Sequence, residues 1–385
     1  MPDPPALVAL ALEQRENGTT LHPSMPDYDN LMARTWGGPP PRWFPQAFSS
    51  FPKQFSAAAG RTALVTGGTG GIGFYVAKLL CRVGMTIVLP ARPRLEAEAA
   101  SAAAAISAAV PGASVVVPEE TLDLGSFSSV RAFGAHMRAS TSVPRIDALV
   151  LNAGRGGPAV GEHEASIDGK EVIMHVNLLG HALLTAELLP LLRRSDHVRI
   201  AAQSSGARFN AKEADMVRDL GTSVAAIANT DTPWDQYSRS KAGACLLARA
   251  LANRMAAAGV SGSATSSDPG LTATGVNVQH DLAATLGGRL PDTKALHDAA
   301  AHHAADGALP IVLATLDETA AAFYSPAGAG RANSLADAAM RLEPNRLRRG
   351  DPAAFPEKIV ESFWQRLVEA TPGLGDAWDA SKKDE

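Results

Sequence analysis

The stretch "TGGTGGIG" at residues 66–73 decides the fold class of this chain. It follows "TALV" at 62–65, which has the apolar character of a buried strand, and it opens a predicted helix over 71–83 that ends at Gly84. A chain that turns here against a pyrophosphate needs residues without a Cβ. The N-terminus of the helix then offers unpaired N–H groups to the phosphates. The stretch therefore predicts a dinucleotide-binding turn, with either Gly67, Gly71 and Gly73 or Gly67, Gly70 and Gly73 as its key glycines.

Strands and helices alternate through the rest of the chain. Further strands are predicted at 86–89, 114–117, 147–151, 198–203 and about 260–266, and helices at about 94–109, 126–139, 170–193, 235–257 and 356–368. This alternation is typical of an α/β fold with a Rossmann-type doubly wound parallel sheet. We expect a single Rossmann-type domain over 61–335, an N-terminal extension over 1–60 and a C-terminal helical elaboration and tail over 336–385.

The N-terminal extension is rich in proline and carries a cluster of aromatic side chains near its end. They are Trp43, Phe44, Phe48, Phe51 and Phe55. We interpret residues 43–55 as a strap packed across the main domain. The alternative is an element that docks on a membrane surface or on a partner protein.

Composition excludes several classes of protein. The 385 residues are 46% hydrophobic and 19% charged, with a formal net charge of -4, which indicates a globular chain without the basic surface that nucleic acid requires. No apolar run is long enough to predict a transmembrane segment. Cys81 and Cys245 lie in apolar helical patterns, so we expect buried thiols in a reducing compartment, the cytoplasm, with peripheral membrane association as the alternative.

Tyr237 and Lys241 in "YSRSK" share one face of a predicted helix, where an ammonium group can stabilise a phenolate. Around them stand "LDL" at 122–124, "LNAG" at 151–154, "VNLLGH" at 176–181, "SSGA" at 204–207 and "PGLTAT" at 269–274. In this order, together with the glycine stretch, the motifs resemble those of the short-chain dehydrogenase/reductase superfamily over about residues 60–330. Within it the chain looks most like the retinol-dehydrogenase-like reductases. The resemblance selects Gly67, Gly71 and Gly73 as the phosphate cradle.

The resemblance implies a catalytic role for each of four residues. Tyr237 would be the general acid or base, and Lys241 would bind the nicotinamide ribose and keep Tyr237 acidic. Ser205 would donate to the substrate carbonyl oxygen, and Asn177 would hold a backbone kink and a water that connects Lys241 to solvent.

Arg92 follows the second strand, where a cation favours the 2′-phosphate of NADP over the ribose of NAD; the alternative is a solvated loop residue. The other cofactor contacts come from the resemblance. They are Gly67, Gly71, Ile72 and Gly73 at the pyrophosphate, Asp123 and Leu124 at the adenine, Asn152 and Gly154 at the adenosine ribose, Tyr237 and Lys241 at the nicotinamide, and Thr272 and Thr274 at the carboxamide and pyrophosphate. Strand-end caps are the alternative for Asp123 and Asn152, and ordinary loop positions for the two threonines.

Two regions depart from the family pattern. The segment between Ser205 and Tyr237 is longer than usual, so we interpret it as an insertion bordering the substrate pocket. A variable loop up to about residue 305 contains His280, His297, His302 and His303, which we expect to be solvated or to line the substrate rather than to bind a metal. Residues 320–327 and the helix at 356–368 are expected to pack in the core or at a subunit contact of a homo-oligomer.

These patterns predict an NADP-dependent oxidoreductase that interconverts a carbonyl, as aldehyde or ketone, and an alcohol on an apolar small molecule. One alternative is a non-catalytic NADP-binding sensor or structural subunit. The other is a reductase of carbon–carbon double bonds that uses the same Tyr and Lys pair.

Overall fold

The computed structural model describes residues 55–156, 162–221, 223–270, 272, 274, 302–317, 323–326, 342–344 and 351–379. The predicted strap over 43–55 lies outside this part of the chain except for Phe55, and His280 and His297 also lie outside it. Phe55 is half-buried and packs against the hydrophobic core.

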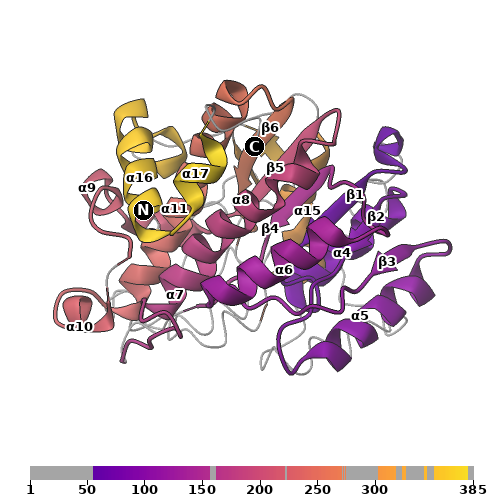
Figure 1. Cartoon of the computed structure of the whole chain (residues 1–385), viewed down its shortest axis with the longest axis horizontal. Coiled ribbons are helices and arrows are strands. Elements are labelled where there is room, and N and C mark those ends of the chain that lie inside the picture. The colour runs from indigo at the N-terminus through magenta and orange to yellow at the C-terminus, as the bar shows by residue number, and fades with distance from the viewer. Residues whose placement is uncertain are drawn as a thin grey trace, which may run out of the picture.

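A twisted sheet runs through the centre of the fold (Figure 1). Its strands are β1 (Thr62–Val65), β2 (Thr86–Val88), β3 (Ser114–Val116), β4 (Ala148–Leu151), β5 (Val198–Gln203), β6 (Gly262–Ser267), β7 (Phe323–Pro326) and β8 (Leu342–Pro344). They lie in the order β3-β2-β1-β4-β5-β6-β7-β8, parallel from β3 to β7, with β8 antiparallel to β7. The predicted Rossmann-type fold is confirmed. Because the strand order reverses beside β1, the crevice for a ligand opens at the carboxyl ends of β1 and β4.

Helices cover both faces of the sheet. They are α4 (Gly71–Arg82), α5 (Glu96–Ala109), α6 (Phe127–Ala139), α7 (Val172–Met174), α8 (Gly180–Leu192), α9 (Glu213–Met216), α10 (Val224–Ile227), α11 (Pro233–Ala257), α15 (Ala304–Leu316), α16 (Glu357–Ala370) and α17 (Leu374–Trp378). Short 3-10 turns span Ser56–Ala58, Gly206–Asn210 and Pro352–Ala354. All the predicted strands and helices within the described residues are present, with boundaries close to those expected.

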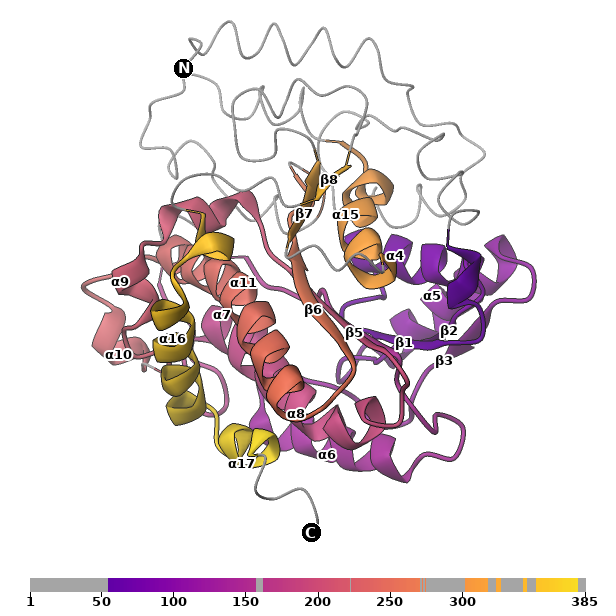
Figure 2. The ribbon, with the colours of Figure 1, turned by 90° about the horizontal axis from the view of Figure 1, so that it is seen from above.

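Alternate residues of each strand enter separate cores on the two faces of the sheet, as the period of a strand requires. In β1, Leu64 packs with α6, α8 and α11, whereas Ala63 and Val65 pack with α4, α5 and α15. Figure 2 shows α15 and α4 on one side of the sheet and α6, α8 and α11 on the other. The central strands are therefore buried on both faces, which explains the continuous apolar runs of β1 and β4.

The predicted long helix over 170–193 contains one irregularity. Between α7 and α8, residues His175–Leu179 form a π-helical turn. Val172–Leu192 is also the one stretch among the described residues that is long and apolar enough to cross a membrane, but nearly all of it is buried inside the fold. Its composition is thus accounted for by packing against α6, α11 and α17.

The C-terminal helices share the core on one face of the sheet. Helix α16 lies along α11 in Figure 2, and its Phe363, Trp364 and Leu367 are buried in the same core as α8 and α11. The guanidinium of Arg254 lies 5.0 Å from the ring centroid of Trp364 and forms an ion pair with Glu361. Phe363, Trp364 and Leu367 therefore pack in the core, which is one of the two roles expected of the helix at 356–368.

Candidate active site

Helix α11 places Tyr237 and Lys241 on one face, at the carboxyl ends of β4 and β5. The helix begins with a capping box between Thr232 and Asp235 and with Pro233 in its first turn, which sets where the helix starts. The Lys241 Nζ lies 5.6 Å from the centroid of the Tyr237 ring and donates to the carbonyl oxygen of Gln203 at 3.2 Å. Both side chains are buried.

Ser205 follows β5 and faces Tyr237. Its hydroxyl accepts from the Ala207 N–H at 3.3 Å, which fixes the start of the 3-10 turn, and it forms a hydrogen bond with the Tyr237 hydroxyl. The residue before it, Ser204, donates to the Lys241 carbonyl oxygen at 2.7 Å and so joins this turn to α11. The structure thus groups the predicted serine, tyrosine and lysine.

Burial dominates the titration of this group. It raises the pKa of Tyr237 to about 12, against the effect of the Ser205 hydrogen bond and with a smaller contribution from Asp268. Burial also lowers the pKa of Lys241 to about 8. At neutral pH Tyr237 therefore holds its proton. Desolvation thus favours the neutral phenol, and the role of Lys241 in keeping Tyr237 acidic stays a prediction.

Asn177 sits in the π-helical turn, so the predicted backbone kink lies where expected. Its Nδ2 donates to the Arg155 carbonyl oxygen and to Ser240 Oγ, both at 2.9 Å, and its Oδ1 accepts from the Arg155 N–H at 2.7 Å. This amide fixes the chain after β4. It brings Gly154 so close to Lys241 that a Cβ there would lie 3.2 Å from Nζ.

The glycine turn fits a phosphate cradle. Gly67 and Gly71 have φ values of +64 and +52, which residues other than glycine rarely adopt. A Cβ at Gly73 would overlap the Gly67 carbonyl oxygen and lie 2.5 Å from Asn152 Nδ2, whereas a Cβ at Gly71 would meet nothing nearer than Thr274 Cγ2 at 3.8 Å. The first turn of α4 has no side-chain cap and no acidic residue, so its N–H groups are available to an anion. Ile72 is half-buried against the core.

Asn152 helps to build the cradle. It donates through Nδ2 to the Thr66 carbonyl oxygen at 3.0 Å, and its N–H donates to Thr66 Oγ1 at 3.0 Å. Thr66 Oγ1 also lies 3.0 Å from His181 Nε2, and burial lowers the pKa of His181 to about 4. Asn152 thus has a scaffolding role in this structure, at the position that the resemblance gives to the adenosine ribose.

Arg92 and Asp123 lie at neighbouring strand ends. Arg92 is exposed beyond β2, and a hydrogen bond from the Leu122 N–H to the Ala91 carbonyl oxygen holds the two segments together at 2.8 Å. Asp123 Oδ1 accepts from the Gly125 N–H at 2.8 Å and so closes a turn. Leu124 is buried in the core, with its carbonyl against Gly180. A cation and a carboxylate therefore stand together at the edge where the adenosine phosphate would lie.

The two threonines of the last motif differ in their surroundings. Thr274 lies beside Gly71, at the cradle. The Thr272 hydroxyl donates to the Pro269 carbonyl oxygen at 3.1 Å and lies 3.0 Å from His302 Nε2, and its side chain packs against Gly307 of α15. Thr272 is thus held by internal contacts, whereas Thr274 adjoins the open cradle.

The two described histidines of the variable loop stabilise local structure. His302 Nε2 lies 2.8 Å from the Pro269 carbonyl oxygen, and His303 caps α15 by accepting from the Ala305 N–H at 3.0 Å. Burial, with His302 and Lys78 nearby, lowers the pKa of His303 to about 3. Among the residues that the structure describes, no group of three His, Cys, Asp or Glu could hold a metal ion.

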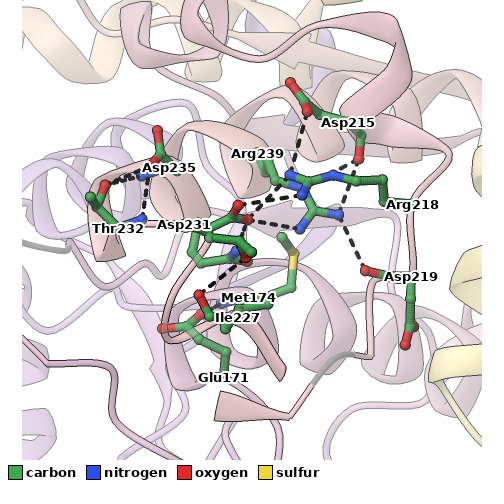
Figure 3. Close-up of polar contacts among 12 residues, drawn as sticks. Glu171, Met174, Asp215, Arg218, Asp219, Ile227, Asp231, Thr232, Asp235 and Arg239 are labelled. Atoms are coloured by element: carbon green, nitrogen blue, oxygen red, sulfur yellow. Dashed lines mark hydrogen bonds and ion pairs between the residues drawn. The ribbon is translucent and has the colours of Figure 1, made fainter. Parts of the chain in front are cut away.

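The insertion between Ser205 and Tyr237 is folded against α11 by charged contacts (Figure 3). Asp231 receives hydrogen bonds from Arg218 at 3.2 Å and from Gln236 at 2.6 Å. Arg239 donates to the carbonyl oxygens of Asp215 and Asp219 at 3.0 and 3.2 Å. These contacts anchor the segment that the sequence predicts to border the substrate pocket.

A small buried apolar cluster packs with the Tyr237 ring on this side. It is built from Val172, Ile173, Ala207 and Tyr237, with Val176 and Trp234 packed against them. The Trp234 ring centroid lies 5.4 Å from that of Tyr237. Sequence reasoning missed Trp234 and also Arg208, which is buried beside Ser205; only their nearness in sequence to Tyr237 and Ser205 could have indicated either.

The sheet order, the glycine turn and the group of Ser205 with the buried Tyr237 and Lys241 define a dinucleotide-binding oxidoreductase domain. A family model described as short chain dehydrogenase matches residues 61–216. This part of the chain belongs to the short-chain dehydrogenase/reductase superfamily, as the sequence motifs predict.

Individual relatives share part of the chain. Human retinol dehydrogenase 14 is 36% identical over 210 residues, which cover 51% of this chain and 57% of that protein. Protochlorophyllide reductase B from rice is 37% identical over 137 residues, covering 35% of this chain and 32% of that protein. The chain spans about half the length of the first curated relatives it matches. A crystal structure of an uncharacterized protein from Mycobacterium paratuberculosis has a TM-score of 0.58 and 26% identity, covering 83% of this chain and 96% of that one.

Proposed function

We propose that this protein is an NADP-dependent oxidoreductase that interconverts a carbonyl and an alcohol on an apolar small molecule. The observation that carries the proposal is the hydrogen bond between the hydroxyls of the half-buried Ser205 and the buried Tyr237, with Lys241 over the Tyr237 ring and the glycine cradle nearby. Asn177 completes the group through its contacts with Arg155 and Ser240. NADPH, when bound, supplies the hydride.

The charge states of these side chains suit reduction. Ser205 donates a hydrogen bond to the carbonyl oxygen and orients it. Tyr237, protonated because burial raises its pKa to about 12, gives its proton to the oxygen as negative charge develops there. Lys241 then lies close enough to the phenolate to stabilise it, and Asn177 holds the backbone that Lys241 packs against.

The preference for NADP is supported by the residues after β2. The sequence there is Leu89, Pro90, Ala91 and Arg92, so an exposed guanidinium stands where a carboxylate would favour NAD. Asp123 lies on the neighbouring strand end and would meet the adenine amino group. Gly67, Gly71, Gly73 and Thr274 would line the pyrophosphate.

The apolar cluster of Val172, Ile173, Ala207 and Trp234 packs beside Tyr237, and apolar surroundings of this kind favour an apolar substrate. Cys81 and Cys245 are buried free thiols, which suits a protein of the cytoplasm or another reducing compartment. Reduction of a carbon–carbon double bond is a second candidate, because the similarity to protochlorophyllide reductase B covers part of the same domain.

The test is oxidation of NADPH by the purified chain with a panel of apolar aldehydes, ketones and enones. We expect turnover of at least one of them, and a loss of about a hundredfold or more in Tyr237→Phe, because general acid catalysis is removed while the ring remains. Tyr324→Phe is the matched control, since Tyr324 is a buried tyrosine whose hydroxyl donates to Asp317 at 2.7 Å.

Product analysis separates the two chemistries. An alcohol product supports carbonyl reduction, and a saturated ketone from an enone supports double-bond reduction. If NADPH binds and neither protein turns over any member of the panel, the reductase proposal fails and a non-catalytic NADP-binding role takes its place.

A further inference from the structure

Arg208 is a fully buried arginine three residues beyond Ser205, and it links three distant parts of the chain. Its Nε and Nη2 donate to Asp351 at 3.1 and 3.0 Å, and Nη1 donates both to Asp268 and, at 3.0 Å, to the Ser205 carbonyl oxygen. The guanidinium is stacked between two rings, 4.1 Å from the centroid of Phe209 and 4.5 Å from that of Phe323. Polar groups and aromatic faces therefore constrain the guanidinium in every direction.

The carboxylates of Asp268 and Asp351 each accept a further hydrogen bond from a backbone N–H. The Gly270 N–H donates to Asp268 Oδ1 at 2.9 Å, and the Ala353 N–H donates to Asp351 Oδ1 at 3.0 Å. Asp268 thus shapes the turn that leads to Thr272 and Thr274, while Asp351 begins the segment before α16. Arg208 holds these two turns against the Ser205 turn.

A buried ion group of this kind is a weak source of net stability, because taking the charges out of water costs about as much as their attraction returns. Burial disfavours the charge of Arg208, but Asp268 and Asp351 outweigh this effect and raise its pKa, so the guanidinium stays charged. Its main consequence is geometric: a planar fork with fixed donors can hold three acceptors in one relative position, which a flexible ammonium cannot do.

The position that it fixes is that of the Ser205 backbone. The Ser205 carbonyl oxygen accepts from Arg208, and the Ser205 hydroxyl contacts Tyr237. A displacement of this turn would separate the Ser205 and Tyr237 hydroxyls, and misplacement by about 1 Å can slow a reaction by about a hundredfold.

We propose that Arg208 is a positioning residue, which uses Asp268 and Asp351 as anchors to hold the Ser205 hydroxyl in register with Tyr237. Resting on the proposed function, this inference adds that the segment before α16 supports the active site through Asp351. The segment before helix α16 is then connected to Ser205 through the hydrogen bonds of Arg208.

The test compares Arg208→Lys with Arg199→Lys. Lys keeps the positive charge but cannot satisfy both carboxylates and the Ser205 carbonyl together. Arg199 is the matched control: it is buried on β5, donates to Ser263 at 2.6 Å, and lies at the opposite end of the strand from Ser205. We expect Arg208→Lys to lower kcat about ten- to a hundredfold, and Arg199→Lys to leave kcat unchanged even if its Tm falls as far.

A double-mutant cycle with Ser205→Ala identifies the route of the effect. If Arg208 acts through Ser205, Arg208→Lys changes kcat little once the serine hydroxyl is gone. Equal losses of kcat in both backgrounds, or an unchanged kcat in a folded Arg208→Lys variant, would overturn the proposal.

Hydrogen exchange measured on the same variants tests the inference without an activity assay. Arg208→Lys should increase amide exchange over 204–211 and 268–270 while β5 stays protected. If the wild-type chain turns over no substrate, the proposed function fails, and the exchange result alone decides whether Arg208 holds this turn: unchanged exchange there overturns the inference.

Discussion

Lys241 lies over the ring of Tyr237, with its Nζ 5.6 Å from the ring centroid, and both side chains are buried away from water. Burial moves the two pKa values apart, that of Tyr237 up to about 12 and that of Lys241 down to about 8. At neutral pH the pair is a neutral phenol beside an ammonium group. This is the protonation state that a carbonyl reductase requires before proton transfer.

We expect kcat for carbonyl reduction to fall as pH rises above about 8, because Lys241 then loses the charge that stabilises the phenolate left after proton transfer. Tyr237 itself stays protonated to about pH 12, so it does not set this limit. The measurement is kcat at saturating substrate between about pH 6 and 10, with folding checked by circular dichroism. A rate that stays constant across this range in folded protein would show that the Lys241 charge is not used.

Arg92→Ala should raise KM for NADPH by about ten- to a hundredfold and leave KM for NADH nearly unchanged, because a charge-assisted hydrogen bond to the 2′-phosphate is lost. Arg94→Ala is the matched control, since Arg94 is exposed in the same loop. Equal effects of the two substitutions, or equal losses with both cofactors, would contradict the assignment of Arg92 to the 2′-phosphate.

Gly71→Ala should weaken NADPH binding more than it lowers stability. The new Cβ would point into open space beside Thr274, where the phosphates are proposed to lie, and the positive φ of +52 adds a strain of about 1 kcal/mol. Gly112→Ala carries a comparable strain at φ +77 in open space away from the cradle. The two variants should therefore show similar Tm values, and only Gly71→Ala should bind NADPH weakly in a fluorescence titration. Normal NADPH affinity in Gly71→Ala would contradict the cradle.

The free energy of unfolding should fall as pH drops from about 6.5 to 4. Burial lowers the pKa of both His175 and His181 to about 4 in the folded chain, whereas the ordinary value is 6.5. In this window the unfolded chain binds more protons than the folded one, so each histidine destabilises the fold by about 1.4 kcal/mol per pH unit.

Urea denaturation at about pH 7 and pH 5 measures this dependence, and His175→Gln should reduce the loss of stability between these two pH values by about 2 kcal/mol. His136→Gln, at a half-buried histidine on α6, serves as the comparison. An identical slope in wild type and His175→Gln would show that His175 does not contribute.

The local elements of this fold could be predicted because their causes are local. The glycine turn, the alternation of strands and helices, and the spacing of Tyr237 and Lys241 depend on residues that are close together in sequence. The resemblance predicts a backbone kink at Asn177, where the structure has a π-helical turn. The hydrogen bonds of Asn177 with Arg155 could not be predicted, because they join different elements.

The sequence by itself determined the doubly wound sheet and the place of the dinucleotide turn, because apolar periodicity and missing Cβ atoms act over short stretches. The Ser, Tyr and Lys group was predicted from the resemblance of the ordered motifs to those of the family. Only the tertiary structure decided that Arg208 joins Ser205 to Asp268 and Asp351, which lie 60 and 143 residues further along the chain. It also decided the protonation of Tyr237 and Lys241. Both outcomes depend on which distant groups exclude water from a side chain or supply its partners, and no local pattern of residues contains that information.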